Sequence, residues 1–484
     1  MQPKGRDKMS VKKMSSCTAM LVGKNASIDG STMIARNEDY YDGVNPKTFQ
    51  VYPAKDYTGE HFKSTYNGLE VDLDGQGCCF TATTNGDINN GRWDEQGINE
   101  YNVAMSASET EMTNPRVLGH DPLVEKGVDE DSMVYLVLPF IKSAREGVQR
   151  LGHLIETYGT GESNGIAFSD NNEVWYFETA GGHQWVAQRI PDDAYAICPN
   201  IMCIEEVNFE DPDNFMFAST IQQFVQDNNL NPYPGSFNFR KIFGTNDEAD
   251  QYYNTPRSWY GQKLFTPSVE QEPTSLDIPF IQRAEKKLAV EDIEYFLSSH
   301  YNGTPYDPTG SYASGDEKDQ KKFRSIALDR NQSSCILQIR NNVPAECAAI
   351  QWINFGFFAY SPYVPFFTNI NATPASYDHA GNKVDDSAYW LQKQLEVIVE
   401  PRYHEFINEV NAFRDASQSY AVKRVDMITA IAKTKQGDAV TDFLTKRNDK
   451  TATHAMDATK DLLNSLIHQS LLNSKFQFER GDNY

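Results

Sequence analysis

Three side chains near the start of the chain have the types that thiol chemistry needs: Cys17, Arg36 and Asp39. Residues 17–23 (CTAMLVG) and 31–36 (STMIAR) are short apolar runs typical of strands, and the turn-forming KNASIDG between them predicts a β-hairpin. In an antiparallel hairpin the first residue of one strand lies beside the last residues of the other. We therefore expect a thiol, a guanidinium and a carboxylate to meet at one end of the hairpin.

A single cysteine is more often a small buried residue than a nucleophile, but the position of Cys17 favours the second role. Residues 1–16 carry five basic residues and one acidic residue, without the apolar core of a secretory signal. If the Ser16–Cys17 bond is cut, Cys17 gains an α-amino group whose ordinary pKa is ~7.7–8.0. This amine can accept the thiol proton, while Arg36 favours the thiolate and Asp39 orients the α-ammonium.

The run from Cys17 to Asp39 resembles the dipeptidase A family of N-terminal-nucleophile hydrolases, which are relatives of bile acid hydrolases and penicillin V acylases. The resemblance covers most of residues 17–370. It continues in WDEQGINEYNVAMSASET (93–110), EVWYFETAGGHQWVAQRIPDDAYAICPN (173–200), YNTPRSW (253–259), HYNGTPYDP (300–308) and FRSIALDR to ILQIR (323–340). It implies an α+β fold, the αββα four-layer sandwich with additional C-terminal helices, autocatalytic processing before the cysteine, and hydrolysis of dipeptides.

The resemblance also implies roles for individual residues. Cys17 would be the nucleophile, Arg36 and Asp39 match an R-x-x-D pattern that supports it, and Asn200 would donate its amide to the oxyanion. Arg257 matches a later active-site arginine. Loss of one oxyanion donor typically costs ~10²–10³ in rate.

The sequence departs from the family pattern at three places. Where the acylase relatives have a further oxyanion asparagine, this chain has Glu109 or its neighbours. FRSI and CILQI, with Ser325 and Cys335, replace the FRPI and HILQI that the family often shows. The identity of the second oxyanion donor therefore stays open.

Composition limits the other possibilities. The chain has 484 residues, 39% of them hydrophobic, and Lys plus Arg (44) against Asp plus Glu (67) gives a net charge of −23. This charge argues against nucleic-acid or membrane partners, which favour a basic surface. Seven cysteines without a C-x-x-C pair argue against a disulfide framework or a structural zinc site. We expect a cytoplasmic protein that needs no metal or organic cofactor.

The pattern along the chain predicts sheet, helices and sheet over residues 17–205. We expect two helices within 132–158, separated at Pro139 and Gly147, and three strands in the runs that follow. A helix is expected within 281–300 and a late strand at CILQIR. We divide the chain into a leader (1–16), a catalytic domain (17–380) and a C-terminal helical segment (381–484). That segment would pack on the catalytic domain or between the subunits of a homo-oligomer.

Three alternatives stay open. The same catalytic residues would serve an amide hydrolase of the bile-salt or penicillin V acylase type, although the long segment 206–345 and HYNGTPYDP favour a dipeptidase. A secernin-like non-enzymatic relative would keep its leader. A conventional Cys–His pair would need His183 or His300, and neither context resembles a papain-type signature.

Overall fold

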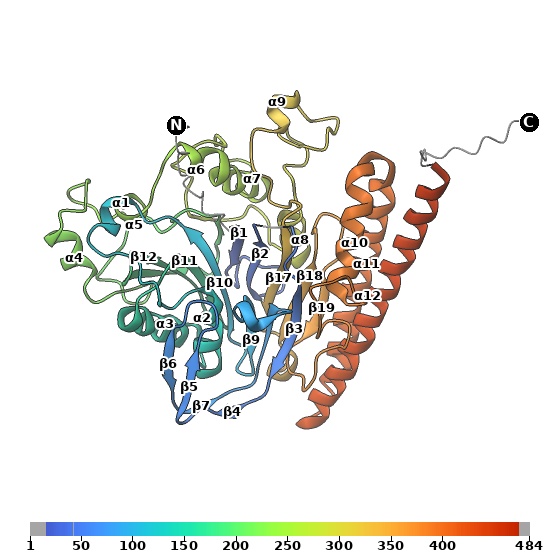
Figure 1. Ribbon diagram of the computed structural model, residues 1–484, viewed down its shortest axis with the longest axis horizontal. Helices are drawn as coiled ribbons and strands as arrows, with labels where there is room; N and C mark the ends of the chain where they lie inside the picture. The colour runs from blue at the N-terminus through green and yellow to red at the C-terminus, as the bar shows by residue number, and fades with distance from the viewer. Residues whose placement is uncertain (1–15, 42, 474–484) are drawn as a thin grey trace, which may run out of the picture.

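The computed structural model describes residues 16–41 and 43–473, and two antiparallel β-sheets stacked face to face form its centre (Figure 1). In spatial order the first sheet contains β16 (Ile281–Gln282), β14 (Tyr195–Cys198), β1 (Ser16–Val22), β2 (Thr32–Asp39), β17 (Asn331–Ile339), β18 (Ala349–Phe355) and β19 (Val364–Phe367). The expected leader lies outside the described residues except for Ser16.

The second sheet packs against β1 and β2 through its strands β10 and β11. In spatial order it contains β15 (Phe215–Phe217), β13 (Gln184–Ile190), β12 (Val174–Ala180), β11 (Ser163–Ser169), β10 (Ala104–Glu111), β9 (Gln96–Asn99), β8 (Phe80–Asn85) and β3 (Lys47–Tyr52). Two small two-stranded sheets precede β8, formed by β4 (Lys55–Asp56) with β7 (Gln76–Gly77) and by β5 (Glu60–Lys63) with β6 (Glu70–Leu73).

Helices cover both sheets and complete four layers (Figure 1). The second sheet carries α2 (Glu130–Val137) and α3 (Ala144–Tyr158). The first sheet carries α7 (Thr255–Phe265), α8 (Val290–Leu297), α10 (Ala388–Val399), α11 (Tyr403–Ala432) and α12 (Asp438–Asn473). Shorter helices lie in the connections: α1 (Pro115–Leu118), α4 (Ile221–Asp227), α5 (Phe239–Phe243), α6 (Glu248–Tyr253) and α9 (Glu317–Gln320). The predicted α+β sandwich with additional C-terminal helices is confirmed.

The predicted N-terminal hairpin is also confirmed. Strands β1 and β2 pair antiparallel, with Ser16 opposite Asp39 and Cys17 opposite Glu38. The start of β1 therefore lies beside the end of β2, as the turn between them predicts.

Three local predictions were wrong in detail. Pro139 does separate α2 from α3, but Gly147 lies inside α3, where a Cβ would come within 2.6 Å of the Phe168 ring. Its role is close packing of a helix on the sheet, not helix termination. Four strands, β11 to β14, follow α3 instead of three, because turns at 170–173 and 181–183 each end a strand. The expected helix at 281–300 is limited to α8, which follows the short β16.

The C-terminal helices pack on the first sheet through β18 and β19, at the right of Figure 1. The predicted boundary at residue 380 falls in the irregular segment before α10. No helix in the described ranges has the length and apolar character needed to cross a membrane.

Candidate active site

The thiol of Cys17 lies between the two sheets, at the start of β1, and the residue is 1% exposed. Its Sγ accepts a hydrogen bond from Nη2 of Arg36 at 2.9 Å. Arg36 lies in the second half of β2. Arg36 is equally buried, so the guanidinium acts on the sulfur with little screening by water. The structure thus places the predicted cation directly on the predicted nucleophile.

The backbone nitrogen of Cys17 has a separate partner. It donates to Oδ1 of Asn200 at 3.3 Å, and the same oxygen accepts from Nη2 of Arg257 at 2.8 Å. Arg257, on α7, also donates from Nη1 to the carbonyl oxygen of Cys17 and to Thr18 Oγ1. Two donors converge on one amide oxygen, so Asn200 presents an acceptor to the nitrogen that would become the α-amine. The expected donation from its amide nitrogen to the oxyanion stays a prediction.

Asp39 contacts the residue before the nucleophile. Its carboxylate accepts hydrogen bonds from Ser16 Oγ at 3.3 Å and from the side chains of Arg324 and Asn331. Arg324 also donates to Ser16 Oγ at 3.0 Å. Asp39 and Arg324 therefore hold the residue whose bond to Cys17 is expected to be cut, and Asn331 holds Asp39. The expected role of Asp39 toward the α-ammonium stays a prediction.

All five sequence-predicted residues thus meet at one place, and the structure adds others that sequence reasoning missed. Arg324 belongs to the FRSI segment, and this family motif is the one sequence feature that could have pointed to it. Glu95 and Glu130 accept hydrogen bonds from Arg36, and Lys47 forms ion pairs with Glu95 and Glu38. The spacing of these three residues along the chain does not indicate that they lie near the site. The side chain of Glu109 lies outside the part that the structure describes.

Burial dominates the ionisation of the nucleophile. It raises the pKa of the Cys17 thiol to about 12, because the lowering effect of Arg36 is smaller than the combined effect of burial and the nearby Glu130 and Glu95. With Ser16 still attached, the thiol is therefore protonated at neutral pH. A base must therefore accept the thiol proton before the sulfur can attack.

The two histidines in suggestive contexts have other partners. His183 Nδ1 lies 2.8 Å from Asp121, and His300 Nδ1 lies 2.9 Å from Asp307. The described hydrogen bonds of Cys17 are to Arg36, Asn200 and Arg257. The geometry gives no support to a Cys–His pair.

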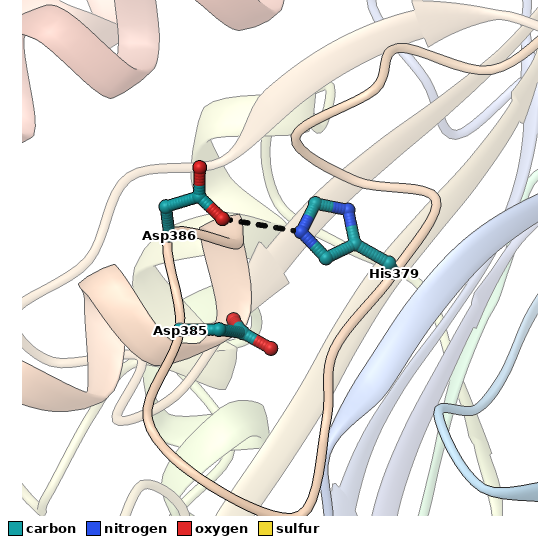
Figure 2. A group of neighbouring side chains, drawn as sticks. All are labelled: His379, Asp385 and Asp386. Atoms are coloured by element: carbon teal, nitrogen blue, oxygen red, sulfur yellow. Dashed lines mark hydrogen bonds and ion pairs between the residues drawn. The ribbon is translucent and has the colours of Figure 1, made fainter.

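A second cluster of ionisable side chains, His379, Asp385 and Asp386, precedes α10 (Figure 2). His379 Nε2 faces Asp386 at 3.4 Å, and its Nδ1 lies 3.1 Å from Asp378. The hydrogen bond to Asp378 raises the pKa of His379, in spite of partial burial. Asp385 accepts the backbone N–H of Gly381 at 2.7 Å. We assign this cluster to ion pairing and loop capping.

Comparison with known proteins agrees with the motifs. The sequence profile of Peptidase family C69 matches residues 16–416. A probable dipeptidase of Latilactobacillus sakei is 48% identical over 471 residues, covering 97% of this chain and 98% of the relative. Dipeptidase A of Lactobacillus helveticus is 39% identical over 463 residues, covering 94% and 97%. The solved structure of penicillin V acylase from Agrobacterium tumefaciens is similar at a TM-score of 0.33 and 13% identity, covering 72% of this chain and 86% of that one. The resemblance read from the motifs is confirmed: the chain belongs to peptidase family C69.

Proposed function

We propose that the protein is a cysteine-type dipeptidase in which Cys17 is the nucleophile and its own α-amino group is the base after removal of residues 1–16. One observation carries the proposal: both reactive atoms of Cys17 have dedicated partners, Arg36 at 2.9 Å from Sγ and Asn200 at 3.3 Å from the nitrogen. A structural cysteine needs neither.

The proposed reaction has two halves. The α-amine accepts the thiol proton, and the thiolate, stabilised by Arg36, attacks the peptide carbonyl carbon. The C–N bond then breaks, and the α-ammonium gives its proton to the leaving amine. In the second half, the amine takes a proton from water, the hydroxide attacks the thioester, and the thiol re-forms as the acid product leaves. Asn200, held by Arg257, keeps the amine beside the sulfur throughout.

The same residues suit cleavage before Cys17. Asp39 and Arg324 hold Ser16 Oγ and so restrain the residue whose carbonyl carbon the thiol would attack. We propose that this processing is autocatalytic. Departure of Ser16 frees the amine and opens the region that it occupied to a substrate.

Dipeptides are the proposed substrates because relatives named as dipeptidases match this chain over nearly its whole length. All seven cysteines, each among the described residues, are free, which is compatible with the expected reducing cytoplasm. We also keep the expectation that the protein assembles as a homo-oligomer.

The test is hydrolysis of a dipeptide panel by the purified protein and by Cys17→Ser, with Cys79→Ser as a matched control at a half-buried thiol outside the site. Wild type and Cys79→Ser should hydrolyse dipeptides, and Cys17→Ser should lose at least about 10³ in kcat/KM. A processed Cys17→Ser with wild-type turnover would refute the nucleophile. A processed wild type that cleaves penicillin V or a bile-salt amide but no dipeptide would favour the acylase alternative.

A further inference from the structure

Behind Arg36 lies a cluster of five charged residues, none more than 5% exposed. Its members are Arg36, Lys47, Glu38, Glu95 and Glu130. Arg36 Nη1 lies 2.6 Å from Glu95 Oε2, and Arg36 Nη2 contacts Glu130 Oε1. Lys47 Nζ lies 2.6 Å from Glu38 Oε1 and 3.1 Å from Glu95 Oε1. Every charge in the cluster is thus removed from water, and the ion pairs described for each member are to other members of the cluster.

The charges in this cluster do not balance if all the carboxyl groups are ionised. Two cations face three carboxylates, and Glu162, from the segment before β11, adds a fourth acid by accepting the backbone N–H of Glu130 at 2.6 Å. A surplus negative charge in a buried site is strongly unfavourable, so a proton is retained. Ionisation of Cys17 would add yet another negative charge to the same site.

Geometry indicates where that proton resides. Glu95 contacts both cations and Glu38 contacts Lys47, whereas the described ion pair of Glu130 is to Arg36 Nη2, which also donates to the sulfur of Cys17. Burial, and then Glu95 and Glu162, raise the pKa of Glu130 well above its usual range, against the effect of Arg36. For Glu95 the effect of burial is outweighed by Lys47 and Arg36, and its pKa is lowered. The interaction between the two carboxyl groups adds to this difference, because it lowers the pKa of Glu95 and raises the pKa of Glu130.

We propose that Glu130 and Glu95 form an acid–carboxylate pair that retains one proton at neutral pH, so that Glu130 positions Arg36 on Cys17 without opposing formation of the thiolate. The neutral carboxyl of Glu130 still accepts from Nη2 and so holds the guanidinium against Sγ. An ionised Glu130 would compete with the thiolate for the same Nη2 and repel it. Glu130 is thus a positioning residue, and this inference rests on the proposed role of Cys17 as nucleophile.

The experiment measures the rate at which iodoacetamide alkylates Cys17 in the mature chain at pH 7, read by peptide mapping so that the other six cysteines do not interfere. Glu130→Gln copies the protonated acid, since its amide can donate to Glu95 and accept from Arg36. It should therefore react within about twofold of wild type. Glu130→Ala removes the acceptor, and the guanidinium should withdraw from Sγ. A rise of one unit in the thiol pKa lowers the thiolate fraction about tenfold, so we expect at least that loss of rate.

Two further measurements protect the interpretation. Glu294→Gln is the matched control, because Glu294 is a buried acid whose described side-chain partner is Gln418, on α11. It should leave the alkylation rate unchanged. The infrared C=O stretching band of protonated carboxylic acid at pH 7 should decrease in Glu130→Gln, even if Glu130→Ala fails to fold.

Each contrary outcome overturns the proposal. If the alkylation rate of Glu130→Gln differs tenfold from wild type in either direction, Glu130 is charged in the wild type and its charge affects the reactivity of Cys17. An unchanged infrared band means that Glu130 holds no proton, and a wild-type rate in folded Glu130→Ala removes its positioning role. Normal alkylation in a protein that hydrolyses no dipeptide would instead refute the proposed function and leave the acid pair intact.

Discussion

The guanidinium of Arg36 divides its hydrogen bonds between a thiol and two carboxyl groups. Nη2 contacts Cys17 and Glu130, while Nη1 contacts Glu95. The planar fork of an arginine can serve three partners in fixed directions, which the single ammonium group of a lysine cannot. The reactivity of Cys17 therefore depends on an arginine whose own position is fixed by acids.

Replacing Arg36 by lysine keeps the charge but not this geometry. We expect the apparent pKa of the Cys17 thiol to rise by about one unit or more, because the cation leaves the sulfur while burial persists. The pH dependence of Cys17 alkylation measures it. Arg240→Lys is the control, since Arg240 is another buried arginine, paired with Glu205. If the pKa of the Cys17 thiol is almost unchanged in both variants, Arg36 does not determine that pKa.

Ser16 offers a second test at the residue scale. Ser16→Ala removes the hydroxyl that contacts Asp39 and Arg324, so cleavage before Cys17 should slow about tenfold, as expected for the loss of two charge-assisted hydrogen bonds. Mass spectrometry over time after synthesis follows the cleavage. Once mature, the variant should have wild-type kcat/KM because the altered residue has gone. Ser27→Ala removes a buried hydroxyl elsewhere and should be processed normally; slowing of both variants alike would argue against a specific role for Ser16.

Among the elements, the β1–β2 hairpin positions the nucleophile and the charged side chains beside it. Along β2, Arg36 and Glu38 face the second sheet, where they contact Glu95 and Lys47, whereas Asn37 faces α8 and donates to the carbonyl of Leu297. Period-two alternation thus separates the charged cluster from the helix layer.

This hairpin could be predicted because the turn and both strands lie within 24 residues, and its register follows from the turn. The acid partners of Arg36 could not. Glu130 is 94 residues away along the chain and reaches Arg36 only because α2 packs on β10, next to β2. Arg324 is 285 residues from Asp39. Local pattern contains no information about such contacts, and only the family resemblance brought Asn200 and Arg257 to the site.

A substitution at Gly147 tests how closely α3 packs on the second sheet. Helix propensity alone predicts that Gly147→Ala stabilises the protein by roughly 1 kcal/mol. The new Cβ would meet Phe168 at 2.6 Å, so we expect a loss of about 1–3 kcal/mol instead. Urea denaturation measures the free energy of unfolding, with the exposed Gln149→Ala as the control, expected within about 0.5 kcal/mol. A gain in stability for Gly147→Ala would contradict the packing.

Where α8 contacts α11, the buried acid Glu294 predicts that the stability of the fold depends on pH. Burial raises the pKa of Glu294 to about 8, and the folded state keeps a proton that the unfolded chain releases near 4.5. The unfolded state thus binds fewer protons, so stability falls as pH rises from about 4.5 to about 8. Glu294→Gln should remove this loss and gain on the order of 1–4 kcal/mol over wild type by pH 8. A difference between variant and wild type that is constant from pH 5 to 8 would contradict it.

For the whole molecule, the end of α12 exposes Ile467, Leu471 and Leu472, the last at 72%. Exposed apolar groups of this kind fit the expected homo-oligomer. Replacing Leu471 and Leu472 by aspartate should reduce the mass measured by sedimentation equilibrium, whereas Val384→Asp, at an exposed valine before α10, should not. An unchanged assembly would place the interface elsewhere.

The central claim is that one residue, Cys17, supplies nucleophile and base in the mature chain. The most direct measurement is intact mass and N-terminal sequencing of the active protein, with dipeptide hydrolysis followed as iodoacetamide is added. We predict a chain that begins at Cys17 and loses activity in proportion to alkylation of that residue. A fully active chain that retains Ser16, or full activity after complete alkylation of Cys17, would contradict it.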